Sequence, residues 1–119
     1  MNQPFVSIVL CTYNGALYIE EQVHSILDQT YRNIELIVVD DCSTDSTKEL
    51  VLEMARNDDR IRFSQNEQNL GYNLNFNYAC SISKGDFIAI ADHDDIWVPE
   101  KIEILVNVLQ KKKDTMLVH

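Results

Sequence analysis

Two aspartates separated by one residue, Asp92 and Asp94, are the residues of this chain best suited to chemistry. They follow the apolar run 87–91 directly, with His93 as a spacer between them. Clustered carboxylates repel one another, and protonation or a bound cation relieves the repulsion. Because oxygen ligands without a thiolate suit Mg²⁺ or Mn²⁺, the pair predicts a divalent metal site. The alternative is a solvated acidic loop before a helix, in which Asp95 acts as a cap.

A second acidic pair, Asp40 and Asp41, ends the apolar run at residues 34–39. These carboxylates could hydrogen-bond the polar edge of a ligand, or they could form a turn or cap the next helix. Tyr13 follows the first apolar run, and its ring could stack on a nucleobase or simply pack against the protein. The residue types alone leave these alternatives open.

The elements that would position these residues alternate along the chain. Apolar runs predict strands at residues 5–11, 34–39, 61–63 and 87–91, and a fifth strand that begins at residues 116–118. Apolar residues at helical spacing predict four helices. The first contains Ile19, Val23, Ile26 and Leu27, and the second contains Leu50, Val51, Met54 and Ala55. The third covers residues 72–83, and the fourth contains Ile102, Leu105, Val106 and Leu109. This alternation is typical of an α/β fold with a mostly parallel sheet and helices on both faces.

Local signals predict how some of these helices begin and end. Ser46 and Glu49 have the spacing of a capping box at the start of the second helix. Gly85 suits the C-cap of the helix at residues 72–83, because glycine adopts a positive φ without strain. Pro99 suits the first turn of the last helix.

Ligands of open parallel sheets bind at the carboxyl ends of the strands. Polar residues follow three of the predicted strands: Thr12, Tyr13, Asn14 and Gly15; Asp40, Asp41, Cys42 and Ser43; and residues 92–95. We therefore expect a polar pocket along this edge. The Asn69-x-Gly71 segment predicts a turn with a positive φ at the glycine. Trp97 is expected in the core, with its indole N–H bonded to a local acceptor.

Composition limits the classes of protein to which the chain can belong. Its 119 residues, of which 45% are hydrophobic and 24% charged, suit one globular domain. The net charge of −9 argues against nucleic acid as a partner. No apolar run approaches the ~20 residues of a membrane span, and we expect no signal peptide. Three cysteines, Cys11, Cys42 and Cys80, favour free thiols in a reducing cytoplasm.

In their joint order, these motifs resemble the family 2 glycosyltransferases, which have the GT-A fold. The matching segments cover nearly the whole chain: residues 6–14, 29–31 and 35–41, Ser43-Thr-Asp45, Asn69-x-Gly71, residues 85–95 and Pro99-Glu-Lys101. The resemblance implies a Rossmann-like sheet. It also implies that residues 1–119 are the N-terminal nucleotide-sugar-binding part of a GT-A domain whose acceptor-binding half is absent.

The resemblance also implies roles for single residues. Tyr13 matches the position that stacks on the base, and Asp41 matches the carboxylate that contacts a pyrimidine ring. Asp94 matches the more direct metal ligand, which acts through the donor diphosphate, and Asp92 lies nearer the ribose and the metal. Further residues expected to line the same pocket are Thr12, Asn14 and Asn69. The catalytic base is expected beyond His119, so no catalytic residue is assigned within the chain.

The implied reaction moves a sugar from a nucleotide diphosphate sugar to an acceptor hydroxyl with inversion, and UDP or dTDP is favoured over a purine nucleotide. Mn²⁺ or Mg²⁺ would join the acidic site to the anionic diphosphate and stabilise the leaving group. The expected acceptor is a saccharide or lipid-linked saccharide of a bacterial surface polysaccharide. This places the protein in the cytoplasm or at the inner membrane face, with a homo-oligomer as an option. One departure is that no lysine or arginine stands near the Asn14 and Asp41 segments.

Two rival hypotheses belong to other classes. A phosphoacceptor receiver domain is also an α/β domain of this length, but its acidic pair follows the first strand, whereas here the pair follows the second. A non-catalytic nucleotide-sugar-binding module would share the pocket and lack the later acidic residue that supports catalysis.

Overall fold

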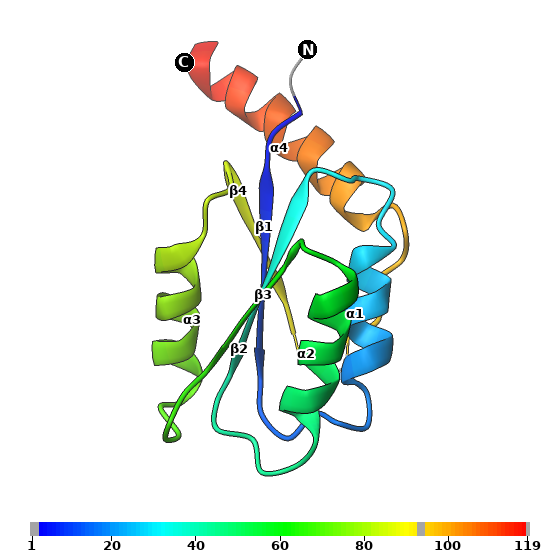
Figure 1. The fold of residues 1–119 in the computed structure, drawn as a ribbon. Helices are drawn as coiled ribbons and strands as arrows, with labels where there is room; N and C mark the ends of the chain where they lie inside the picture. Colours follow the sequence, from blue (N-terminus) through cyan, green and yellow to red (C-terminus); the bar gives the residue numbers. More distant parts are fainter. Residues whose placement is uncertain (1–2, 93–94, 119) are drawn as a thin grey trace.

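The computed structural model describes residues 3–92 and 95–118 of the chain. Within these ranges the elements are β1 (Val6–Thr12), α1 (Ile19–Leu27), β2 (Ile34–Asp40), α2 (Thr47–Asn57), β3 (Ile61–Gln65), α3 (Tyr72–Ile82), β4 (Phe87–Ala91) and α4 (Lys101–Val118). The strands form one sheet in the order β3-β2-β1-β4, and each of its pairings is parallel (Figure 1). The predicted α/β class with a mostly parallel sheet is confirmed.

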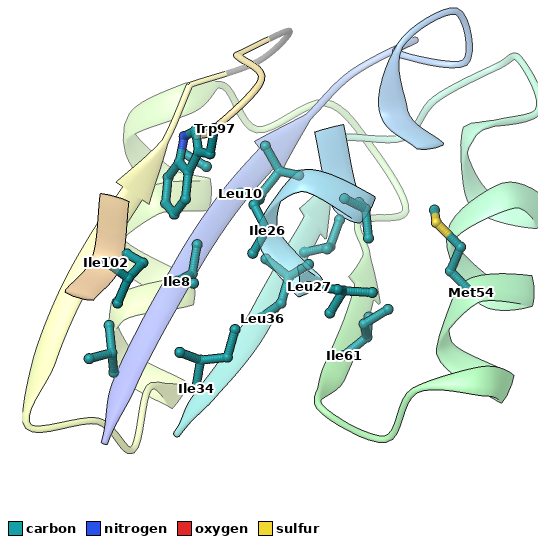
Figure 2. Packing of buried hydrophobic residues seen from close by; sticks show 14 of the residues in the cluster. Ile8, Leu10, Ile26, Leu27, Ile34, Leu36, Met54, Ile61, Trp97 and Ile102 are labelled. Atoms are coloured by element: carbon teal, nitrogen blue, oxygen red, sulfur yellow. The ribbon is translucent and has the colours of Figure 1, made fainter. Parts of the chain in front are cut away.

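Helices cover both faces of this sheet, which is why β1 and β2 are nearly continuous apolar runs. Side chains from α1, α2 and α4 pack on one face, around Ile8, Leu10 and Leu36 (Figure 2). On the other face α3 packs through Ala79 and Phe76 against Val9 and its neighbours. Figure 1 shows α3 on the opposite side of the sheet from α1 and α2.

The strand order changes direction at β1, and this change creates the place for a ligand. The chain adds β2 and then β3 on one side of β1, and α3 then carries it back across to β4 on the other side. In open α/β sheets, the carboxyl ends of the two strands at such a switch point flank a crevice. Here these strands are β1 and β4, in a register that pairs Leu10 with Ala91.

At the opposite edge of the sheet, a buried carboxylate ties three segments together. Glu35 accepts hydrogen bonds from the Ser7 hydroxyl at 2.5 Å, the Lys84 backbone N–H at 2.8 Å and the Arg62 guanidinium at 2.9 Å. Burial alone would raise the pKa of Glu35, but these hydrogen bonds and the Arg62 charge outweigh burial and lower it. The network fixes the start of β4 against β1 and β2.

Gly85 belongs to this junction, and its predicted role as a C-cap is wrong. The helix α3 ends at Ile82, and Ser83 leaves it in an extended conformation with ψ of 139°. A Cβ on Gly85 would lie 2.5 Å from the Ser7 backbone nitrogen and 2.8 Å from the Phe5 carbonyl oxygen. The glycine is therefore needed for close approach to β1.

The predicted start of α2 also differs from the structure. Ser46 has φ of −85° and ψ of 13°, outside the extended geometry typical of an N-cap, and makes no side-chain cap bond, so the predicted capping box with Glu49 does not form. The Asp45 carboxylate accepts the Thr47 N–H at 3.0 Å instead.

Both ends of α4 differ from the predictions. The helix begins at Lys101, two residues after Pro99, and the Gln29 side chain accepts the Ile102 N–H at 2.9 Å. Residues 116–118 continue α4 and form no fifth strand, because neither glycine nor proline interrupts the helical pattern before them. Of the predicted apolar face, Ile102 and Val106 are buried, whereas Leu105 and Leu109 are exposed.

Trp97 lies in the core as predicted, but its indole N–H has no partner within the described ranges, so the expected acceptor is wrong. The Lys101 ammonium lies 4.4 Å from the centre of the Trp97 ring, a cation–π arrangement. The three cysteines are free, as predicted. None of the helices in the described ranges is both long and apolar enough to cross a bilayer.

The close approach at Gly85 predicts that Gly85→Ala destabilises the protein. The added Cβ must displace backbone atoms of β1, and overpacking of this kind typically costs about 1–3 kcal/mol. Urea denaturation would measure the loss in free energy of unfolding. The matched control is Lys84→Ala, which changes an exposed neighbour and keeps the backbone N–H that Glu35 accepts. Equal stabilities of the two variants would contradict this account of Gly85.

Candidate nucleotide-binding site

A pocket of about 310 Å³ opens at the carboxyl edge of the sheet, where β1 and β2 end and α3 begins. Its lining residues are Cys11, Thr12, Tyr13, Tyr18, Asp41, Tyr72 and Asn75. Three of the predicted site residues, Thr12, Tyr13 and Asp41, are thus brought together in one pocket. None of the lining residues is a lysine or an arginine.

Asp41 holds the loop that forms one wall of this pocket. Its carboxylate accepts hydrogen bonds from the Leu70 N–H at 2.7 Å, the Gly71 N–H at 3.1 Å and the Asn66 side chain at 3.1 Å. Burial by itself would raise the pKa of Asp41, but these bonds, with one from Asn75, outweigh it and lower the pKa to about 2. The carboxylate is therefore ionised and already engaged before any ligand arrives.

The predicted turn at Asn69-x-Gly71 completes this wall. Gly71 has φ of 89°, as predicted, and a Cβ there would meet nothing within 4 Å, so the backbone angle and not crowding requires glycine. The Asn69 side chain donates to the Asp41 carbonyl at 2.7 Å. Asn69 thus braces the loop and is not among the lining residues of the pocket.

Asp40, unlike Asp41, does not line the pocket, and its hydrogen bonds stabilise the fold. It is fully buried and accepts the Ser43 N–H at 2.9 Å and the Gln65 side-chain amide at 2.8 Å. These bonds close the loop after β2 and join it to β3. Of the two alternatives for the acidic pair, the turn therefore applies to Asp40.

Asn14 also connects loops and does not line the pocket. Its side-chain oxygen accepts the N–H groups of Thr44 at 2.8 Å and Asp45 at 3.3 Å. Its own N–H donates to the Ser43 hydroxyl at 2.8 Å, and its φ is 50°. Asn14 thus positions the segment that follows β1 against the segment that follows β2.

Thr12 and Tyr13 present groups that the protein itself leaves unused. The Thr12 hydroxyl oxygen is buried and has no hydrogen-bond partner in the described part of the chain. A buried unpaired hydroxyl is costly, and a bound ligand could pair with it. The Tyr13 ring is 50% exposed and so remains available for stacking.

Asp92 follows β4 and is exposed. Its backbone carbonyl accepts a hydrogen bond from the buried Gln22 side chain, which ties the end of β4 to α1. His93 and Asp94 lie outside the described residues, so the structure does not test the metal role predicted for Asp94. Among the residues that are described, no cluster of three or more His, Cys, Asp or Glu side chains could hold a metal.

Sequence reasoning missed four of the lining residues, Cys11, Tyr18, Tyr72 and Asn75, and also Asn66, which donates to Asp41. Asn75 is 2% exposed and accepts a hydrogen bond from Asn66. The available signal was its position four residues before Ala79, on the face of α3 that packs against the sheet. A polar residue on a packing face requires partners, and here those partners are the pocket wall and Asp41.

The parallel sheet and a pocket at the carboxyl ends of its strands are features of an α/β domain of the GT-A type. Residues 7–119 match the family described as glycosyl transferase family 2, and the chain therefore belongs to this family. This membership removes the phosphoacceptor receiver hypothesis.

Curated relatives agree with this assignment. An uncharacterized glycosyltransferase of Haemophilus influenzae is 41% identical over 110 residues, which are 92% of this chain and 34% of the relative. The putative teichuronic acid biosynthesis glycosyltransferase TuaG of Bacillus subtilis is 40% identical over 101 residues, which are 85% of this chain and 40% of TuaG. The chain thus spans little more than a third of the length of these relatives.

Solved structures show the same fold. S. aureus TarS 1-349 in complex with UDP-GlcNAc superposes with a TM-score of 0.82 at 32% identity, over 90% of this chain and 31% of that one. The mannosyltransferase PcManGT from Pyrobaculum calidifontis, in complex with GDP-Man and Mn²⁺, gives a TM-score of 0.75 at 30% identity, over 81% of this chain and 29% of that one.

The lowered pKa of Asp41 predicts how acid affects stability. Its folded value of about 2 lies below the ordinary 3.8, so its stabilising effect is complete above about pH 4 and is lost as the pH falls toward 2. We expect Asp41→Asn to be less stable than the wild type at pH 7. The difference in free energy of unfolding should shrink between pH 4 and 2, as measured by urea denaturation at fixed pH.

A matched control for this experiment is Glu49→Gln. Glu49 is exposed on α2, and the described part of the structure gives it no hydrogen bond. Its stability difference from the wild type should stay small across the same pH range. A difference for Asp41→Asn that stays constant from pH 4 to 2 would contradict the role given to the ionised carboxylate.

Proposed function

We propose that this chain binds the nucleotide diphosphate sugar of a glycosyltransferase, and that the protein transfers the sugar to an acceptor hydroxyl. The observation that carries the proposal is the pocket at the carboxyl edge, where Tyr13, the unpaired Thr12 hydroxyl and Asp41 meet. Asp92 follows the neighbouring strand at the same switch point. Solved family members with UDP-GlcNAc and GDP-Man support a sugar nucleotide as the ligand class.

In this proposal the base enters the pocket and stacks on Tyr13. The Thr12 hydroxyl and the wall held by Asp41 would meet the polar edge of the base, and the ribose and diphosphate would extend toward Asp92. We propose a pyrimidine nucleotide, UDP or dTDP. The TarS complexes with UDP and with UDP-GlcNAc support this choice.

Charge supports a divalent cation as a further component. A diphosphate is anionic, the chain carries a net charge of −9, and no lysine or arginine lines the described pocket. Side chains that offer only oxygen in an acidic setting suit Mg²⁺ or Mn²⁺. We propose that Asp92 and Asp94 hold the ion, which would stabilise charge on the departing diphosphate. The Mn²⁺ in the PcManGT complex supports this choice.

The acceptor, the stereochemistry and the location of the reaction are proposed from membership of the family. The acceptor would be a saccharide or lipid-linked saccharide of a bacterial surface polysaccharide, a choice supported by the relative TuaG, which is named for teichuronic acid biosynthesis. Transfer would proceed with inversion, and we assign the general base to none of the residues 1–119. The proposed location is the cytoplasm or the inner face of the membrane.

The metal proposal predicts that UDP binds only with a divalent cation. Calorimetry with Mn²⁺ and with excess chelator should show binding in the first case and a large loss in the second. Asp94→Asn should weaken Mn²⁺-dependent binding, and its matched control Asp95→Asn should change it little. UDP binding of equal strength in excess chelator would rule out the cation.

Stacking on Tyr13 predicts a second outcome. Base–aromatic stacking is worth about 1–3 kcal/mol, so Tyr13→Ala should weaken UDP binding roughly 5- to 150-fold. Tyr13→Phe keeps the ring and should bind UDP nearly as well as the wild type. The same calorimetric titration checks both variants, and an unchanged Kd for Tyr13→Ala would remove Tyr13 from the site.

A further inference from the structure

Tyr72 is an exposed aromatic residue that the fold itself does not require. It is the first residue of α3, and its side chain is 54% exposed, so it contributes little to the core. It nevertheless lines the pocket together with Asn75, three residues along the same face of the helix. An aromatic side chain that is left in water beside a pocket is a candidate ligand contact.

The Tyr72 ring has an aromatic neighbour that restricts its orientation without a ligand. It stacks on Phe76 with a centroid distance of 6.0 Å and an interplanar angle of 10°. Phe76 packs in turn against the second core cluster, which includes Val9 and Ala79. A rigid aromatic ring loses little conformational entropy on binding, so this one is prepared for a ligand.

The backbone before Tyr72 is fixed as well. Asp41 accepts the N–H groups of Leu70 and Gly71, and the positive φ of Gly71 directs the chain into α3. Asp41 therefore places Tyr72 over the pocket in addition to forming part of the pocket wall.

Tyr72 lines the pocket beside Cys11, which lies near the end of β1. Burial raises the pKa of Tyr72, and the nearby Cys11 and Asp92 raise it further. A phenolic hydroxyl can donate one hydrogen bond, and the groups whose charge acts on Tyr72 belong to the end of β1 and to the residue after β4. That position corresponds to the path proposed for the ribose and diphosphate.

We propose that Tyr72 is a nucleotide-binding residue, whose ring forms a wall of the pocket and whose hydroxyl donates a hydrogen bond to the nucleotide beside Asp92. The inference rests on the proposed function, and it adds a contact from α3 to those from the strand ends. It also gives Asp41 a positioning role, because the loop held by Asp41 sets the place of Tyr72.

The test is calorimetric titration of the chain with UDP and Mn²⁺. Tyr72→Ala removes the ring and the hydroxyl and should weaken binding about 10-fold or more. Tyr72→Phe keeps the stacking on Phe76 and removes only the hydroxyl, so it should weaken binding roughly 2- to 10-fold. The matched control is Tyr78→Ala on the same helix, 46% exposed and not among the lining residues, which should bind like the wild type.

The possible outcomes separate this inference from the proposed function. If the wild type binds UDP and Tyr13→Ala weakens it, while both Tyr72 variants bind like the wild type, the role of Tyr72 is overturned and the proposed function stands. A loss as large in Tyr78→Ala as in Tyr72→Ala would also overturn it, because the effect would then come from the helix as a whole. If the wild-type chain binds no nucleotide diphosphate, the proposed function and this inference fall together.

Discussion

The pocket depends on the placement of one ionised carboxylate, Asp41, where the second strand ends. Two backbone N–H groups and an asparagine side chain converge on it, so a loop far along the chain closes against the end of β2. Charge-assisted hydrogen bonds of this kind are roughly twice as strong as neutral ones. The start of α3, the position of Tyr72 and the shape of the pocket all follow from where this carboxylate lies.

A carboxylate holds neighbouring segments together at each edge of the sheet, but the groups around the two carboxylates differ. At the amino edge, Glu35 binds Ser7, Arg62 and the backbone before β4, and its charge is balanced by an arginine. At the carboxyl edge, Asp41 is surrounded by N–H groups and amides, and no cation is among its hydrogen-bond partners in the described structure. The carboxylate at the first edge is paired with a cation, whereas the carboxylate at the second edge keeps its negative charge beside the pocket.

Much of the fold could be predicted, because the signals for its strands and helices lie in consecutive residues. The apolar runs of β1, β2 and β4 and the apolar spacing of α1 are properties of consecutive residues, and the structure confirms these elements. The positive φ of Gly71 was predictable for the same reason. The sequence also indicated that Thr12, Tyr13 and Asp41 follow strand ends, and in a parallel sheet this suffices to bring them together.

Several of the predictions that failed depended on contacts between distant segments. Gly85 is required by Ser7, which lies 78 residues earlier, and α4 begins where Gln29 accepts its N–H. Tyr72 and Asn75 reach the pocket only because α3 crosses back over the sheet, and no local pattern contains that crossing.

The strand β4 carries a consequence for how the chain behaves in solution. In the described sheet β4 pairs with β1 on one side only, and the Ile88 and Ile90 side chains are about half exposed. An open strand edge with apolar side chains is a template on which another chain can pair. The net charge of −9 opposes the approach of like molecules, and dissolved salt screens this repulsion over about 10 Å at 0.1 M. For residues 1–119, the electrostatic resistance to pairing at this edge therefore depends on ionic strength.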